Sequence, residues 1–199
     1  MGWMNDETGL GKCPANYVPL TPLSHLRRAA HVFATRTAVI YGDHRVTYAQ
    51  YYERCTRLAA GLADMGVTSG DVVATLIPNL PAQAEAHFGV PACGAVLNTI
   101  NTRLDVDTVA YIFEHGEAKV ILADPQFVEL AEAAAARLTG PKPVIVEVPD
   151  AANGWPASGR NKTYEDMLAA ADPTYEWIMP EDEWESLALN YTSGTTGRP

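Results

Sequence analysis

Apolar positions along this chain follow two rhythms that alternate. Some stretches place an apolar residue every three or four positions, which is the period of a helix with one buried face, and others are short, nearly continuous apolar runs. The clearest run covers residues 72–77 and is typical of a strand buried on both faces, as strands of parallel sheets are. The pattern therefore predicts a chain in which helices and strands take turns.

Capping residues predict where most helices begin, because a Thr or Asp side chain can accept a hydrogen bond from a free backbone N–H of the first turn. The predicted caps are Thr21, Thr47 (with Gln50 as a capping box), Asp105, Asp124 and Thr163. Helices are expected over residues 22–33, 48–65, 82–88, 106–115, 127–138 and 164–171, with Pro91 as a kink or a late turn. Strands are expected over residues 37–41, 72–77, 95–98, 119–123, 143–148 and 187–191, and another extended piece starts at Val46.

From residue 72 onward, strands and helices alternate strictly. This order predicts right-handed crossovers, so the expected fold class is α/β, with a mainly parallel sheet and helices on both faces. Such sheets bind ligands beyond the carboxyl ends of their strands. We divide the chain into an N-terminal extension (residues 1–20), an α/β subdomain (residues 21–186), and a strand with a loop (residues 187–199).

The composition is that of a soluble globular protein, with 47% hydrophobic and 19% charged residues. The net charge of -10 argues against a nucleic-acid partner and means that a site for polyphosphate must be organised locally. No apolar run approaches the roughly 20 residues that cross a bilayer. The first residues lack the features of a signal peptide, and Cys13, Cys55 and Cys93 match no zinc or disulfide pattern, so a cytoplasmic location is expected.

The final strand leads into the segment with the strongest chemical signal, Tyr191-Thr-Ser-Gly-Thr-Thr-Gly-Arg-Pro199. Its glycines let backbone N–H groups approach a phosphate closely, and its hydroxyls add donors without bulk. The two glycines are separated by two residues, whereas the P-loop of nucleoside triphosphatases has four residues between its glycines. An ordinary Ser/Thr/Gly turn is the alternative. The predicted phosphate-binding residues are Thr192, Ser193, Gly194, Thr195, Thr196 and Gly197.

This loop resembles the phosphate-binding signature of the adenylate-forming superfamily, which includes acyl-CoA synthetases, peptide-synthetase adenylation domains and luciferases. Residues 37–62, 85–104 and 115–120 are also similar to that superfamily, and the last two look like its short- and medium-chain acyl-CoA synthetase branch, which includes plant-type acyl-activating enzymes and methylmercaptopropionate–CoA ligases. The resemblance implies an ATP-dependent acyl-CoA ligase that uses ATP, Mg²⁺ and CoA. Its partners would be a small carboxylic acid, ATP and CoA, and a homodimer remains open.

The resemblance also implies that the rest of the N-terminal domain and the mobile C-terminal domain are absent, so the chain by itself is expected to be an inactive N-terminal fragment. No catalytic residue, metal ligand or acyl-pocket residue is assigned. Two other hypotheses stay open: a non-catalytic interaction module, and an adenylation domain that loads a carrier protein instead of CoA.

Several other polar residues have ordinary structural explanations. We expect His87 on a helix surface, His115 as a cation near a helix C-terminus that Gly116 closes, Asp105 as a cap, and Cys93 as a small core residue. Asn98, Asn101 and Arg103 lie between a strand and a helix, where hydrogen bonding to the backbone is the default and contact with substrate is the alternative.

Overall fold

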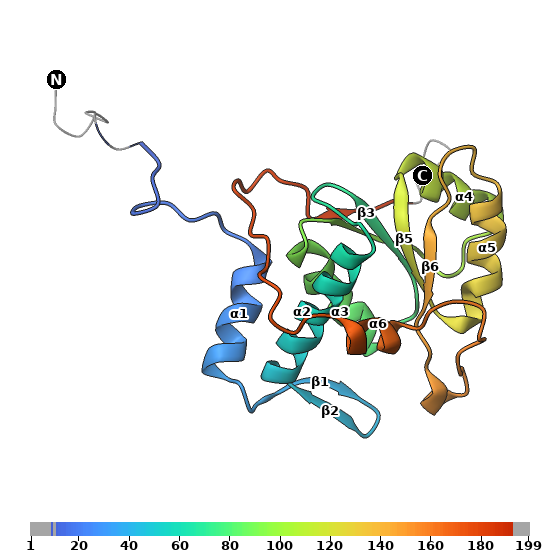
Figure 1. Cartoon of the computed structure of the whole chain (residues 1–199), viewed down its shortest axis with the longest axis horizontal. Coiled ribbons are helices and arrows are strands. Elements are labelled where there is room, and N and C mark those ends of the chain that lie inside the picture. Colours follow the sequence, from blue (N-terminus) through green and yellow to red (C-terminus); the bar gives the residue numbers. More distant parts are fainter. Residues whose placement is uncertain (1–8, 10, 193–199) are drawn as a thin grey trace.

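A five-stranded sheet forms the centre of the molecule (Figure 1). The computed structural model describes residue 9 and residues 11–192. In the sheet the order is β6-β5-β3-β4-β7, and every neighbouring pair is parallel. The strands are β3 (Val72–Leu76), β4 (Val96–Thr99), β5 (Ala118–Ala123), β6 (Val144–Glu147) and β7 (Ala188–Leu189). The predicted α/β class and its mainly parallel sheet are confirmed.

Helices cover both faces of this sheet, again as predicted. One face packs against α2 (Tyr48–Asp64), α3 (Pro81–Ala92) and α6 (Tyr164–Ala170), and the other packs against α4 (Val106–His115) and α5 (Val128–Ala136). The chain goes from β3 to β4 and then back across β3 to β5, which places α3 and α4 on opposite faces. Figure 1 shows α4 and α5 on one side of the sheet and α2, α3 and α6 on the other.

The two faces have separate apolar cores because successive residues of a strand point to opposite faces. In β3 and β5, Val73 and Val120 belong to the core under α2 and α3, whereas Ala74 and Ile121 belong to the core under α4 and α5. All four are at most 1% exposed. This burial on both faces is why the central strands are apolar at nearly every position.

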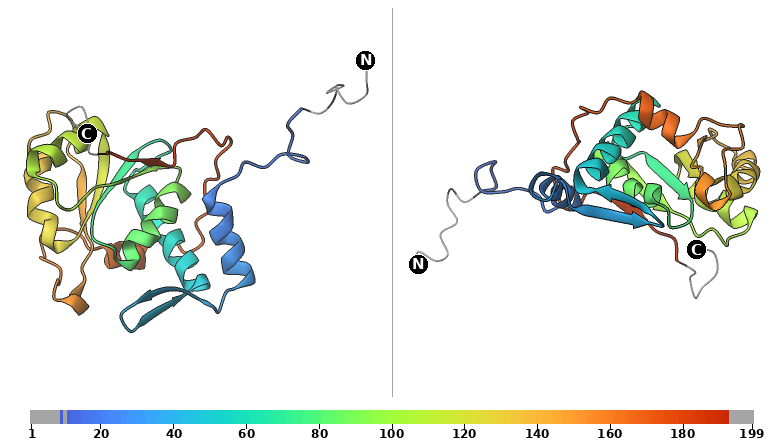
Figure 2. Two further views of the ribbon diagram at one scale, coloured as in Figure 1. Left: turned by 180° about the vertical axis from the view of Figure 1, so that it is seen from behind. Right: turned by 90° about the horizontal axis from the view of Figure 1, so that it is seen from below.

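A smaller unit lies beside α2. It contains α1 (Pro22–Val32) and the antiparallel hairpin of β1 (Thr37–Tyr41) and β2 (His44–Thr47). Its apolar contacts with α2 centre on Leu26, Val46 and Tyr51. Both views in Figure 2 place α1 at the opposite end of the molecule from α4 and α5.

The predicted caps all form. Each capping side chain accepts a hydrogen bond from a backbone N–H two or three residues further along the chain, and Thr47 and Gln50 make the complete capping box. The caps are Thr21, Thr47, Asp105, Asp124 and Thr163. Asp124 caps a single 3₁₀ turn, η2 (Pro125–Phe127), and α5 starts only after it, so the predicted helix over residues 127–138 is shorter than expected.

Two helix ends differ in detail from the prediction. Pro91 lies inside the last turn of α3, which continues to Ala92, so it is a late turn. Gly116 does end α4, but at a φ of -83°; the residue with positive φ is Glu117, at 52°. Strand β7 is also shorter than the predicted residues 187–191.

The loop between β6 and α6 is organised around one buried carboxylate. Glu147, at the end of β6, is 0% exposed and accepts hydrogen bonds from the backbone N–H of Ser158 (2.7 Å) and of Asn161 (3.2 Å), and from both of their side chains. Burial alone would raise the pKa of Glu147, but these hydrogen bonds outweigh it and lower that pKa. A short 3₁₀ turn, η3 (Ala151–Asn153), lies in the same loop.

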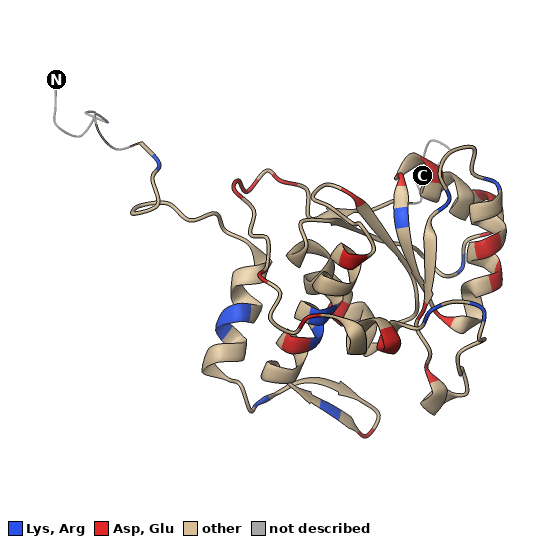
Figure 3. Cartoon of the chain, in the orientation of Figure 1, with Lys and Arg blue, Asp and Glu red and all other residues tan. Residues whose placement is uncertain are grey.

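Charged residues of both signs are interspersed along the described chain. Figure 3 shows the Lys and Arg residues of the described chain scattered over different elements, with acidic residues among them. Residues 11–20, in the predicted N-terminal extension, contain no helix or strand and lead away from α1 in Figure 1. None of the helices that the structure describes combines the length and the apolar composition needed to span a bilayer.

Candidate functional site

The predicted phosphate-binding loop starts where the described chain ends. Thr192 is exposed and follows β7 closely, whereas Ser193, Gly194, Thr195, Thr196 and Gly197 lie outside the described residues. Because β7 is parallel to β4, Thr192 leaves the sheet on the side where the other strands also have their carboxyl ends. Open α/β sheets bind ligands at this edge. The start of the loop therefore lies at this edge, and the role of the loop in phosphate binding stays a prediction.

Two side-chain contacts hold the residues that lead into this loop. In the first contact, the Thr99 hydroxyl at the end of β4 donates a hydrogen bond to the Asn190 side-chain oxygen, at 3.3 Å. Asn190 directly follows β7 and belongs to neither of the ladder pairs of that strand, which are Leu97 with Ala188 and Asn98 with Leu189. The contact therefore continues the attachment of the chain to β4 beyond the last paired residue.

The second contact involves a cluster of aromatic rings from α4. Tyr191 Oη lies 2.7 Å from His115 Nδ1 at the end of that helix. The ring of Tyr111, one turn earlier, stacks on His115 with centroids 5.4 Å apart and meets Tyr191 edge-on at 6.5 Å. Burial raises the pKa of Tyr191, and Tyr111 adds to the effect, so the phenol is neutral near pH 7.

Gly116 makes this close packing feasible. A Cβ at this position would lie 3.2 Å from Leu189 Cδ2 and 3.3 Å from Tyr191 Oη, besides 2.9 Å from the carbonyl oxygen of Ile112. The end of α4 therefore fits tightly against β7 and the residue that precedes Thr192. The sequence analysis assigned His115 only a helix-terminal charge, because a partner 76 positions away leaves no local signal.

Most of the other candidates behave as their ordinary explanations predict. Asn98 does not: it lies within β4, not in the loop after it, and its buried side-chain amide makes no hydrogen bond to the backbone of the described residues. Asp105 Oδ1 accepts from the backbone N–H groups of Asp107 and Thr108, and Asn101 Oδ1 accepts from that of Arg103. His87 is exposed and contacts the Gln83 carbonyl at 2.7 Å. Cys93 is buried, and this burial raises the pKa of its thiol to about 11, which opposes a role as a nucleophile.

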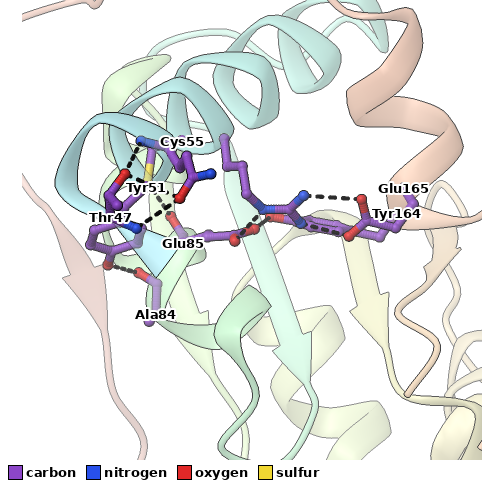
Figure 4. Close-up of polar contacts among 9 residues, drawn as sticks. Thr47, Tyr51, Cys55, Ala84, Glu85, Tyr164 and Glu165 are labelled. Carbon is purple, nitrogen blue, oxygen red and sulfur yellow. Dashed lines mark hydrogen bonds and ion pairs between the residues drawn. The ribbon is translucent and has the colours of Figure 1, made fainter. Parts of the chain in front are cut away.

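A second polar assembly lies at the interface of α2, α3 and α6 (Figure 4). Glu85 of α3 is 1% exposed, and its carboxylate accepts hydrogen bonds from Arg54 Nε (2.5 Å) and from the Tyr164 hydroxyl (2.7 Å). Arg54 reaches Glu165 with its two remaining nitrogens, at 3.0 and 2.5 Å. One guanidinium thus joins three helices through two carboxylates.

The charges in this assembly compensate one another. Burial opposes the charge of Arg54, but its hydrogen bonds to Glu165 and Glu85 outweigh that and raise its pKa. Burial, followed by the charge of Glu85, raises the pKa of Tyr164, which therefore donates as a neutral phenol. A cavity of about 340 Å³ lies beside the assembly and is lined by Arg54, Glu85 and Tyr164 among others. Because each polar group already has a partner, the arrangement is suited to holding helices together.

Sequence analysis missed this assembly. Glu85 lies on the side of α3 that also carries the buried Ala82 and Ala86, and a carboxylate among buried positions is a signal that a partner must exist. The partner itself could not be inferred, since Arg54 is 31 positions away and Tyr164 is 79 positions away.

Three buried polar side chains lie near the carboxyl ends of β3, β4 and β5. Within the described residues, the Thr75 hydroxyl, both polar atoms of the Asn98 amide and Asp124 Oδ2 have no hydrogen-bond partner. Burial raises the pKa of Asp124. Asn98 is the register neighbour of Leu189, so it lies directly beside the strand that leads to the predicted loop.

No metal-binding cluster is found in the part of the chain that the structure describes. We assign no metal ligand.

Comparison with known proteins identifies the family. The sequence pattern of the AMP-binding enzymes matches residues 26–199, which is most of the chain. The chain belongs to the AMP-binding enzyme family.

Several curated relatives of this family member are CoA ligases by name, and others are named probable acyl-activating enzymes. The chain is 46% identical to the peroxisomal acetate/butyrate–CoA ligase of Arabidopsis thaliana, in an alignment that covers 98% of this chain and 36% of the relative. It is 42% identical to the peroxisomal trans-cinnamate:CoA ligase of Petunia hybrida, covering 96% of this chain and 36% of that enzyme. The chain therefore spans about a third of the length of these relatives.

Solved structures agree with the fold. An anthranilate CoA ligase in complex with anthranoyl-AMP superimposes with a TM-score of 0.82 at 25% identity, covering 95% of this chain and 35% of the ligase. The N-terminal domain of FACL13 from Mycobacterium tuberculosis gives a TM-score of 0.73 at 26% identity, covering 89% of this chain and 42% of that domain.

Proposed function

We propose that the chain forms the first part of an ATP-dependent acyl-CoA ligase. The observation that carries the proposal is the glycine- and hydroxyl-rich segment that begins at Thr192, at the carboxyl edge of the sheet, in a chain of the AMP-binding family whose curated relatives are named as CoA ligases. The proposed reaction has two steps. A carboxylate attacks the α-phosphate of ATP to give an acyl-adenylate and pyrophosphate, and the CoA thiol then displaces AMP.

The role of the loop lies in the first step. Negative charge accumulates on the departing pyrophosphate, and fixed N–H and hydroxyl donors stabilise that charge. We assign this work to Thr192, Ser193, Gly194, Thr195, Thr196 and Gly197. Magnesium would neutralise phosphate charge as well.

The acid is proposed only as a small carboxylic acid. The relatives are named for acetate, butyrate, 2-methylpropanoate and trans-cinnamate, and these acids differ in length and shape. A cytoplasmic location is also part of the proposal, whereas several relatives are named as peroxisomal. Microscopy of the tagged protein would separate the two compartments.

A chimera tests the activity. Residues 1–199 replace the aligned third of the Arabidopsis acetate/butyrate–CoA ligase, to which they are 46% identical, and ATP–pyrophosphate exchange is measured with acetate and butyrate. We expect exchange by the chimera and none by residues 1–199 alone. A folded chimera without exchange, next to an active parent, would refute the proposal. In the full-length parent protein, product formation with CoA but not with a carrier-bound pantetheine arm is the expected result; the reverse would favour a carrier-loading enzyme.

A further inference from the structure

The backbone attachment of β7 is short. Its ladder to β4 contains two residue pairs, Leu97 with Ala188 and Asn98 with Leu189, and Leu97 N–H also donates to the Leu187 carbonyl at 3.2 Å. After Leu189, the described contacts of the chain with the sheet and helices are made by side chains. The direction in which the chain enters the predicted loop therefore depends on how Asn190 and Tyr191 are held.

Tyr191 is the residue directly before Thr192, and it is held by a residue of a different element. Its hydroxyl lies 2.7 Å from His115 Nδ1, the two rings meet at 79° with centroids 5.7 Å apart, and Tyr111 packs against both. The absence of a side chain at Gly116 lets the end of α4 approach Tyr191. This contact is more specific than the charge effect that any histidine has at a helix C-terminus.

We propose that His115 is a positioning residue for the nucleotide phosphates: through Tyr191 it fixes where the hydroxyl-rich loop leaves the sheet. This inference rests on the proposed function of that loop. Imidazole Nδ1 can donate or accept a hydrogen bond, and so can a phenol, so the contact needs no particular tautomer. An asparagine side chain can place an amide group close to the position of Nδ1, whereas alanine cannot.

The kinetic test uses the chimera with His115→Ala, His115→Asn, Tyr191→Phe and the double variant His115→Ala/Tyr191→Phe. Loss of one hydrogen bond should lower kcat/KM for ATP in pyrophosphate exchange by about 2- to 10-fold in each single alanine or phenylalanine variant. The double variant should have a kcat/KM no lower than that of the less active single variant, because both changes remove the same contact. His115→Asn should recover most of the activity, and thioester formation from supplied acyl-adenylate should stay within about twofold.

His31→Ala is the matched control, since His31 is also the histidine of a last helical turn, on α1, and is also exposed. It should leave exchange unchanged. An equal loss in His31→Ala and His115→Ala, additive losses in the double variant, or no loss in any variant of an active chimera would overturn the inference.

Hydrogen exchange of residues 1–199 supplies a readout that is independent of activity. His115→Ala should speed exchange at residues 190–192 and leave β3 as protected as before. Unchanged exchange at residues 190–192 would overturn the inference while an active chimera keeps the proposed function intact. Conversely, an inactive native chimera would refute the ligase proposal even where hydrogen exchange confirms the contact.

Discussion

At the scale of single residues, two buried carboxylates of the described chain are stabilised by different kinds of partner. Glu85 is 1% exposed and has Arg54 and Tyr164 as partners, whereas Glu147 is 0% exposed and relies on neutral donors from Ser158 and Asn161. The first carboxylate joins helices and the second organises a loop. Removing the charge of Glu85 and removing that of Glu147 should therefore affect the free energy of unfolding in different ways.

Glu85→Gln should lower the free energy of unfolding by about 2–3 kcal/mol, because it removes one charge from a buried pair. The loss stays near the lower end of the range for such pairs because Arg54 keeps Glu165 and its side chain is 30% exposed. Glu53→Gln is the matched control: Glu53 pairs with Arg57 on the same helix, but its side chain is 54% exposed, so the change should cost about 0.5 kcal/mol or less. Urea unfolding measures both, and equal losses would contradict this assignment.

Glu147 predicts a dependence of stability on pH. Its pKa is lower in the folded protein than in the unfolded chain, so the folded state favours the charged form. The resulting stability is fully present above the unfolded value of about 4.3 and is lost as pH falls through the lower folded value.

The free energy of unfolding of Glu147→Gln should therefore fall furthest below that of the native chain near neutral pH. This difference should shrink as the solution is acidified below about pH 4. Unfolding free energies measured at several pH values test this. A difference that stays constant down to the acid limit would show that the charge of Glu147 does not stabilise the fold.

At the scale of elements, α2 and α3 pack closely against each other. Gly89 of α3 faces Leu58 of α2, and a Cβ on Gly89 would lie 2.6 Å from Leu58 Cδ2 and 2.9 Å from its Cβ and Cγ. Leu58 is fully buried, so it has little room to move. The glycine therefore sets how close the two helices lie, and with them the position of Glu85 next to Arg54.

Gly89→Ala should destabilise the protein by about 1–3 kcal/mol through overpacking, although alanine is the better helix former. Gly140→Ala is the control, because a Cβ there meets nothing within 4 Å and should change stability by about 0.5 kcal/mol or less. Thermal or urea unfolding measures both. A stabilised Gly89→Ala variant would mean that helix propensity outweighs the contact with Leu58.

Sequence reasoning succeeded at this scale wherever the signal was local. The caps at Thr47 and Asp105 were predictable because a capping side chain and the backbone N–H that donates to it lie within one turn, and strand β3 because its apolar run is nearly continuous. The contacts of Glu85 and His115 were not predictable, because their partners are brought close only by the packing of distant elements. The site is thus foreseeable as a loop at the sheet edge, but the side chains that hold its start are not.

At the scale of the whole molecule, the sheet order explains why the loop starts where it does. The crossovers bring β4 and β7 together although their sequences are about 90 positions apart, and the parallel pairing turns both carboxyl ends to the same edge. The overall negative charge repels polyphosphate, so the attraction must come from groups at that edge. The backbone N–H groups and hydroxyls of the loop are therefore expected to supply the attraction for phosphate.

The two half-reactions can separate this role from a purely structural one. Thr195 and Thr196 lie between the two glycines of the loop, where the backbone can come closest to phosphate. Losing a hydrogen bond to a charged group costs about 1.5–3 kcal/mol, which corresponds to about a 10- to 200-fold lower rate if the bond forms mainly in the transition state. Thr195→Ala/Thr196→Ala in the chimera should therefore depress adenylate formation by at least this range. Thioester formation from supplied acyl-adenylate should change much less, because pyrophosphate has already left before that step. Equal losses in both steps would show that the loop holds the fold or the AMP group, and the assignment of these residues to the β- and γ-phosphates would be wrong.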